Sequence, residues 1–154
     1  MTKDNKEHTQ HHDNQPGEVH LPLADLVKIR RDKVLNFQKQ GVTVYPYKYA
    51  RTHSAKELLE KFDDLSAAAT IVSIAGRIML KRDMGKASFA HVSDQSGKIQ
   101  IYLKMDIIGE SEFKQFVELD LGDIVGCEGA LFTTKTGEKT LRVSKYEILC
   151  KSLH

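Results

Sequence analysis

The sequence contains no tryptophan, three prolines and only two cysteines among its 154 residues. Cys127 and Cys150 cannot form the disulfide framework of a small secreted domain, and their spacing matches no zinc-ligand pattern. No apolar stretch approaches the ~20 residues that a membrane-spanning helix needs. The polar N-terminus does not resemble a secretory signal. These absences favour a soluble cytoplasmic protein with reduced thiols and no membrane association.

The sequence also lacks a recognisable set of catalytic or metal-binding residues. His53 and His91 stand apart from any candidate nucleophile, and isolated residues of this kind are usually structural. His8, His11 and His12 have no carboxylate or cysteine partners arranged around them, so we expect a solvated tail there. We therefore expect no catalytic residue, no metal and no cofactor in this chain.

Basic residues are concentrated near the N-terminus, although the net charge is only +2. Residues 21–51 contain seven basic and two acidic residues, whereas residues 52–154 contain fourteen basic and fifteen acidic ones. This asymmetry is typical of an electrostatic arm that contacts a polyanion.

The first part of the chain is predicted to contain a tail and a helix. Residues 1–20 are rich in polar residues and lack apolar periodicity, which predicts a disordered tail. Apolar residues recur at helical spacing over residues 22–40, and Gly41 suits the end of this helix. The polar face of the helix carries Lys28, Arg31 and Lys39. These cations could follow the phosphates of an RNA stem or form an ordinary charged surface.

A second, shorter helix is predicted to start near Ser54. Ser54 is followed three residues later by Glu57, which is the spacing of a capping box. We therefore expect a helical segment over residues 21–68, between the tail and a domain of strands that begins at residue 69.

From residue 70 onward the pattern changes to strands. Phe113, Phe116 and Val117 interrupt this pattern with helical spacing, which predicts a helix over residues 110–119. The strands are expected over residues 71–79, 88–92, 98–103, 123–133 and 140–149. Five strands with one helix between the third and fourth is the order of the OB fold, a small barrel. The expected class is therefore mainly β: an OB-fold barrel over residues 69–154, preceded by N-terminal helices.

Strand alternation predicts which side chains lie outside the barrel. In the third strand Ile99 and Ile101 suit the core, so Gln100 faces outward. Arg77 is expected to face outward from the first strand. The second strand is ambiguous because a lone phenylalanine such as Phe89 is usually buried. Its alternate residues Ser88, Ala90 and Val92 are small enough for a barrel interior, which favours an exposed Phe89.

The expected outer face has the chemistry of single-stranded RNA recognition. Strands two and three and the neighbouring hairpin loops form the nucleic-acid face of this fold. Phe89 would stack on a base, and Gln100 would offer a donor and an acceptor to a base edge. Glu138, in the last hairpin, would accept a hydrogen bond from a base N–H. The basic residues that would contact phosphate are Arg77, Lys81, Arg82 and Lys86.

Five separated runs of the sequence resemble the anticodon-binding domain of bacterial-type lysyl-tRNA synthetases. The runs are residues 75–77, 81–89, 94–100, 120–126 and 134–138, and Arg51 and the stretch Tyr45-Pro46-Tyr47 also fit. The resemblance implies that Phe89, Gln100 and Glu138 hold the central uracil of the anticodon. It also implies that Arg77 and Arg82 belong to the same surface.

The resemblance does not extend to the catalytic domain of that family. It implies a parent lysine–tRNA ligase that uses ATP and magnesium in its catalytic domain, forms a homodimer and works in the cytoplasm. The 154 residues contain none of the class II catalytic motifs, so we expect a domain fragment that cannot aminoacylate alone. Its expected partner is the anticodon stem-loop of a lysine tRNA.

Three other functions remain open from the sequence. The anticodon domain of an aspartyl- or asparaginyl-type synthetase shares the central uracil, although the basic hairpin and the turn at residues 134–138 favour lysine. A general single-strand binder would also bind unrelated oligonucleotides. A barrel used for protein assembly would lack the steep salt dependence that phosphate contacts produce.

Overall fold

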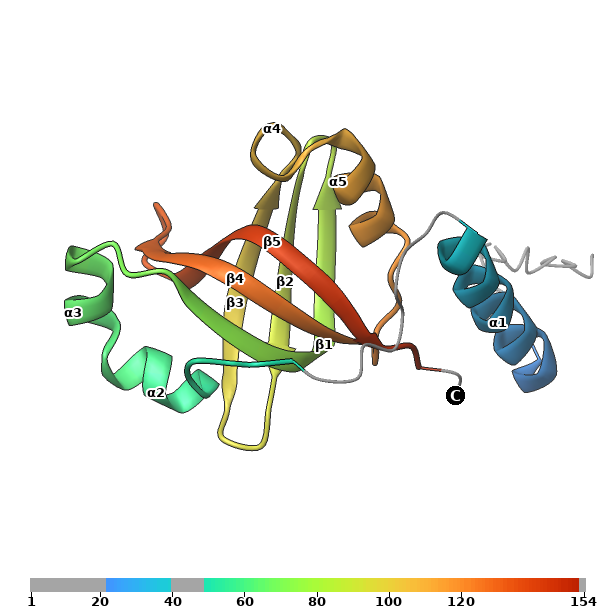
Figure 1. Ribbon diagram of the computed structural model, residues 1–154, viewed down its shortest axis with the longest axis horizontal. Helices are drawn as coiled ribbons and strands as arrows, with labels where there is room; N and C mark the ends of the chain where they lie inside the picture. The colour runs from blue at the N-terminus through green and yellow to red at the C-terminus, as the bar shows by residue number, and fades with distance from the viewer. Residues whose placement is uncertain (1–21, 40–48, 153–154) are drawn as a thin grey trace, which may run out of the picture.

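A closed barrel of five strands forms the centre of the molecule (Figure 1). The computed structural model describes residues 22–39 and 49–152. The strands are β1 (Val72–Met84), β2 (Ala87–Ser93), β3 (Lys98–Lys104), β4 (Ile124–Thr133) and β5 (Lys139–Cys150). They follow the order β1-β2-β3-β5-β4 around the barrel, and β3 and β5 are paired in parallel. This topology confirms the expected OB fold.

Helices precede the barrel and interrupt it once. They are α1 (Leu23–Lys39), α2 (Ala55–Glu60), α3 (Phe62–Ala67), α4 (Met105–Ile108) and α5 (Glu110–Val117). The helix expected between the third and fourth strands is α5, whereas α4 and the separation of α2 from α3 were not anticipated. The expected tail at residues 1–20 and the Tyr45-Pro46-Tyr47 stretch lie outside the described residues. No helix within the described ranges is both long and apolar enough to cross a bilayer.

The capping box expected at the start of α2 is present. Ser54 Oγ accepts a hydrogen bond from the Glu57 backbone N–H at 3.2 Å, and the Ser54 N–H donates to Glu57 Oε1 at 3.3 Å. Asp94, in the turn between β2 and β3, accepts a further bond from the Ala55 N–H at 2.8 Å. The first N–H groups of α2 are thus satisfied by its own cap and by the barrel.

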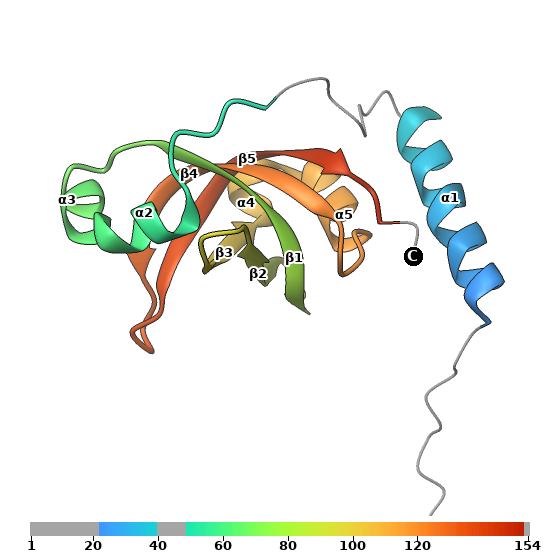
Figure 2. The ribbon, with the colours of Figure 1, turned by 90° about the horizontal axis from the view of Figure 1, so that it is seen from below.

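The core fills the barrel interior and continues under the helices. Ile99, Ile101 and Leu103 of β3 are buried, and Ala90 and Val92 of β2 face the same interior. The buried side chains also include Phe113 and Phe116 from α5, Leu58 from α2, Phe62 from α3 and Phe37 from α1. Figures 1 and 2 place α1 at one end of the molecule and α2 and α3 at the other, with the barrel between them.

A β-bulge in β1 changes which side chains face the interior. The pairing of β1 with β2 shifts between Ile78 and Leu80, so Met79 is an extra residue in the strand. Beyond the bulge, Lys81 is opposite the buried Ala90, and Arg82 is opposite Phe89. Simple alternation from Arg77 would give Lys81 the outward position, but the bulge gives that position to Arg82.

A buried ion cluster joins α1 and the end of β5 to the loop before β4. The Lys151 ammonium is fully buried and lies 2.6 Å from both Asp120 Oδ2 and Asp123 Oδ2. Lys33 of α1 contacts the other oxygen of Asp120 at 2.8 Å. The Ser152 N–H donates to Asp123 Oδ1 at 2.8 Å. Burial opposes ionisation of Asp120, but its bonds to Lys151 and Lys33 outweigh that effect and hold its pKa below the usual range.

Candidate nucleic-acid interface

Two rows of side chains lie on one face of neighbouring barrel strands, and all of them except the buried Thr140 are exposed or half-buried. Register pairs Arg82 with Phe89, Phe89 with Tyr102, and Tyr102 with Arg142, so the first row runs over β1, β2, β3 and β5. The second row contains His91, Gln100, Thr140 and Phe132, from β2, β3, β5 and β4. Because strand neighbours are about 5 Å apart, side chains within a row can touch.

Three aromatic rings form a continuous surface over these rows. The centroids of Phe89 and Tyr102 are 4.8 Å apart with an angle of 35° between the ring planes. The ring of Phe132 meets that of Tyr102 edge-on, at 5.9 Å and 60°. The Arg142 guanidinium carbon lies 4.4 Å from the centroid of the Phe132 ring, which is cation–π distance. All three rings are half-buried, so each retains exposed area for a ligand.

A groove of about 520 Å³ lies over this surface, and we call it the strand-face groove. Its lining includes the three rings, the Gln100 amide, Thr134 and Thr136 of the last hairpin, and the cations Arg82, Lys135 and Arg142. The groove therefore combines planar apolar faces with hydrogen-bonding groups and positive charge. Stacking surfaces beside cations are what proteins use to hold unpaired nucleotides.

Hydrogen bonds connect the Gln100 side chain to both neighbouring strands. Gln100 Nε2 donates to Thr140 Oγ1 at 3.1 Å, and Gln100 Oε1 lies 3.3 Å from His91 Nε2. The Thr140 hydroxyl donates to the Glu138 carbonyl at 3.1 Å. The amide expected to read a base is therefore held within a chain of polar groups.

The structure brings Phe89, Gln100 and Arg82 together in the strand-face groove. Glu138 is exposed in the hairpin between β4 and β5, outside the groove lining, and its backbone is bonded to Thr134 and Thr140. Glu138 is two residues before Thr140, the residue that accepts a hydrogen bond from the Gln100 amide. The hairpin itself is where the sequence predicts it.

The other basic residues expected on this surface lie elsewhere. Arg77 is in the middle of β1, before the bulge, where Nη1 donates to the Gly122 carbonyl at 3.2 Å and the side chain lines a separate hollow with Ser93. Lys86 is exposed in the turn between β1 and β2, outside the groove lining.

Lys81 contacts the end of α5 instead of the groove. Its Nζ donates to the carbonyls of Val117 and Leu119 and lies 3.2 Å from Asp83, and only 9% of the side chain is exposed. Burial lowers the pKa of Lys81, and the Asp83 carboxylate partly opposes this change. The bulge at Met79 is the reason that this cation faces inward. The geometry gives Lys81 a structural contact.

Sequence reasoning assigned no role to Tyr102, Phe132 and Arg142. Tyr102 follows the buried Ile101 on β3, so alternation gives it an outward position. Phe132 and Arg142 follow the buried Leu131 and Leu141, so the same alternation along the last two strands could have identified both of them.

Residues 22–39 and 49–152 contain no cluster of three or more histidine, cysteine or acidic side chains able to hold a metal ion. Burial raises the pKa of the Cys127 thiol to about 12, which makes it unreactive near neutral pH.

Comparisons with known proteins agree with this geometry. Residues 72–149, from the start of β1 almost to the end of β5, match the tRNA anti-codon family model, described as an OB-fold nucleic-acid-binding domain. The chain is 49% identical to the lysine–tRNA ligase of Carboxydothermus hydrogenoformans over 134 residues, which are 87% of this chain and 27% of that protein. It is 43% identical to the lysine–tRNA ligase of Bacillus cytotoxicus over 139 residues, covering 87% of this chain and 28% of that protein.

A third relative extends the same pattern. The lysine–tRNA ligase of Clostridium acetobutylicum is 46% identical over 132 residues, which are 85% of this chain and 25% of that protein. This chain thus spans about a quarter of the length of the curated relatives it matches. The family model covers the whole set of strands that builds the groove. The chain therefore belongs to the tRNA anticodon family of OB-fold nucleic-acid-binding domains.

Proposed function

We propose that this chain is the anticodon-reading module of a lysine–tRNA ligase and holds an unpaired anticodon base in the strand-face groove. The observation that carries this proposal is the position of the Phe89 ring and the Gln100 amide in one groove on adjacent strands. A stacking ring and a hydrogen-bonding amide on paired strands of one groove can hold one base by its face and by its edge.

Stacking supplies most of the affinity in this proposal. The Phe89 ring is supported from one side by Tyr102, so its exposed face is fixed before the nucleotide arrives. Stacking of a base on an aromatic side chain contributes about 1–3 kcal/mol in comparable sites. Phe132 and Tyr102 extend the apolar floor beneath neighbouring nucleotides.

Cations on the rim of the groove hold the RNA backbone. Arg82 comes from β1, Lys135 from the last hairpin and Arg142 from β5, so positive charge borders the rings on several sides. Arg142 also lies over Phe132, which leaves its guanidinium able to stack on a base or to contact phosphate. Glu138 completes the proposed contacts by accepting a hydrogen bond from a base N–H.

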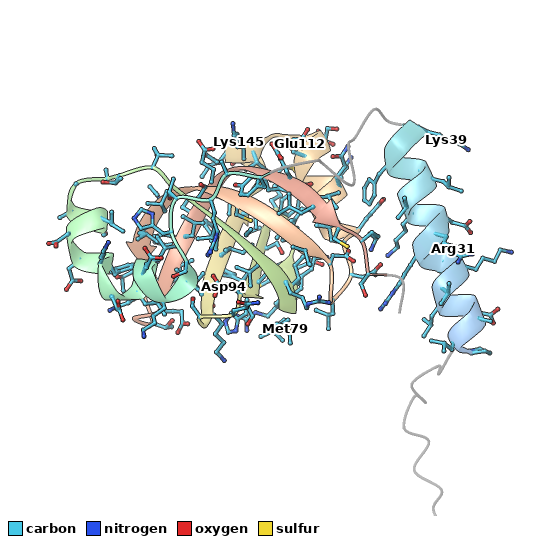
Figure 3. The ribbon with its side chains drawn as sticks, turned by 60° about the horizontal axis from the view of Figure 1, so that its bottom comes forward. Arg31, Lys39, Met79, Asp94, Glu112 and Lys145 are labelled. Atoms are coloured by element: carbon cyan, nitrogen blue, oxygen red, sulfur yellow. The ribbon has the colours of Figure 1, made fainter. Side chains whose placement is uncertain are left out.

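Helix α1 offers a second positive surface. In Figure 3, Arg31 and Lys39 project from α1 on the side away from the barrel, and both are exposed. We propose that these residues contact the phosphates of the tRNA stem while the groove holds the loop. Such contacts add affinity without base specificity.

Specificity for lysine tRNA is supported by the relatives, because each of the three described above is a lysine–tRNA ligase. By the same proposal, the parent protein is a homodimer in the cytoplasm that attaches lysine to tRNA. ATP and magnesium would be bound in a domain outside these 154 residues.

The proposal is tested by titrating the protein into a fluorescently labelled anticodon stem-loop of lysine tRNA. Loops with each anticodon base changed in turn, and an unrelated single strand of equal length, are the controls. We expect the unchanged loop to bind most tightly and a change of the central uracil to weaken binding most. Equal affinity for all the loops and for the unrelated strand would instead identify a general single-strand binder.

A further inference from the structure

The side chain of Gln100 has a neighbour on each side in the second row of the groove. His91 is opposite Gln100 on β2, and Thr140 is opposite Gln100 on β5. The two contacts, at 3.3 Å and 3.1 Å, engage opposite ends of the amide: its oxygen and its nitrogen. The amide therefore cannot rotate without changing both contacts.

The Thr140 hydroxyl determines which end of the amide faces it. A hydroxyl has one proton, and that of Thr140 is donated to the Glu138 carbonyl, which can only accept. Thr140 is fully buried, so water does not compete for this bond. Thr140 Oγ1 is then available to Gln100 only as an acceptor, so the Gln100 NH₂ group must face it. The amide oxygen consequently faces His91, which must carry a proton on Nε2.

A flipped amide is less favourable. It would place the oxygen against Thr140, and the hydroxyl proton would have to leave the Glu138 carbonyl to meet it. The His91 ring would have to change tautomer to accept from the NH₂ group. The flip thus costs one hydrogen bond, which corresponds to roughly a fivefold to tenfold preference for the observed orientation.

From this geometry we propose that His91 and Thr140 are positioning residues that fix the orientation of the Gln100 amide and so let the groove distinguish uracil from cytosine. The inference rests on the proposed function. After these two contacts, the amide retains one N–H and one acceptor direction for a ligand. Uracil offers a carbonyl beside an N–H, whereas cytosine offers an amino group beside a bare ring nitrogen. An amide held in one orientation matches one of these patterns, but an amide free to flip can match both.

The fixed orientation of the Gln100 amide can be tested without RNA by nitrogen NMR of the histidine rings at alkaline pH. We expect the His91 ring to carry its proton on Nε2. A proton on Nδ1 would overturn the inference, because Nε2 could then only accept and the amide oxygen would have no donor.

The consequence for recognition is tested with uracil and cytosine at the central anticodon position. Thr140→Val keeps the shape of a fully buried side chain but removes the oxygen, and the Glu138 carbonyl keeps its bond from the Thr134 N–H at 2.9 Å. His91→Phe keeps a planar ring without the donor. We expect Thr140→Val to reduce the preference for uracil over cytosine by roughly fivefold to tenfold. His91→Phe is expected to reduce it by less, because Thr140 still orients the amide. His91→Gln restores a donor and is expected to recover part of the preference.

A matched substitution on the adjacent strand provides the control. Thr133 is exposed on β4 and does not line the groove, so Thr133→Val is expected to leave the preference unchanged. If the wild-type protein prefers uracil and Thr140→Val keeps that preference in full, the fixed amide orientation is disproved while the proposed function stands. If the wild-type protein binds neither loop, the proposed function fails and so does the inference about the amide orientation.

Discussion

The ring of Phe89 packs against the ring of Tyr102 on the adjacent strand, with the centroids 4.8 Å apart and the planes inclined by 35°. Tyr102 therefore supports Phe89 from the side without covering it, and the half-buried Phe89 ring keeps a face in the groove. This relationship makes Phe89 the residue whose removal should affect RNA binding most.

Phe89→Ala is expected to weaken binding of the anticodon stem-loop by about 1–3 kcal/mol, because one stacking partner is lost. The measurement is a fluorescence anisotropy titration, with circular dichroism to check the fold. Ile71→Ala removes an exposed apolar side chain just before β1 and is the control. Unchanged affinity in a folded Phe89→Ala protein would exclude this ring from the site.

Arg82 and Lys81 are expected to respond differently to substitution, although they are adjacent in sequence. Arg82→Ala should lower affinity and reduce the slope of log affinity against log salt by about 0.7, the value for one phosphate contact to a single strand. Lys81→Met should leave that slope unchanged. It should lower the free energy of unfolding by about 1–2 kcal/mol, because the carbonyls of Val117 and Leu119 lose a charged donor.

Salt-series titrations and urea unfolding of both variants measure these two effects. The prediction depends on the bulge at Met79, which exchanges the faces of the two residues. A reduced salt slope for Lys81→Met together with an unchanged slope for Arg82→Ala would contradict it.

Lys151→Met is expected to destabilise the fold by about 3–5 kcal/mol, because the buried Asp123 would lose its cation and the partly buried Asp120 would keep only Lys33. Lys145 provides a matched control, since its contact with Glu128 is 3.6 Å long and 70% of its side chain is exposed. Figure 3 shows Lys145 at the surface of the barrel. Lys145→Met should change stability by less than about 1 kcal/mol. Urea unfolding curves that shift equally for both variants would disprove this difference.

Asp94 is expected to make stability depend on acid pH. Burial opposes its ionisation, but hydrogen bonds from the Ser96 hydroxyl and from the N–H groups of Ala55, Ser96 and Gly97 outweigh burial and lower its pKa. A carboxyl whose pKa is lower in the folded state stabilises the protein above its unfolded pKa of about 3.9, and this stabilisation is lost as the pH falls through the folded pKa.

Asp94→Asn should therefore be less stable than the wild type near neutral pH, by about 1–2 kcal/mol. The difference should shrink as the pH falls below about 4. Urea unfolding of both proteins across this range measures it, and Asp32→Asn, at an exposed position of α1, serves as the control. A difference that stays constant or grows toward low pH would be inconsistent with an ionised, hydrogen-bonded Asp94.

Much of the barrel could be predicted from the sequence because strand alternation records which side chains are buried. The small residues Ser88, Ala90 and Val92 correctly placed the β2 interior, and this in turn placed Phe89 on the outer face. The capping box at Ser54 was also predictable, because it depends on contacts within a few residues.

Features that depend on contacts between distant segments could not be predicted from the sequence. The bulge at Met79 is a property of strand pairing that no local sequence pattern indicates, so the inward position of Lys81 could not be predicted from the sequence. The contacts of Lys151 with Asp120 and Asp123 join segments about thirty residues apart in sequence. Only the folded barrel brings those charges together.

The parallel pairing of β3 with β5 has a consequence for how RNA binding could be acquired during folding. Gln100 and Thr140 meet across this pairing, with the whole of α4, α5 and β4 between them along the chain. Until β5 pairs with β3, the Gln100 amide has its contact with His91 but not the one with Thr140, and Arg142 is not yet beside the groove. Complete RNA binding should therefore require the closed barrel, with β5 paired to β3.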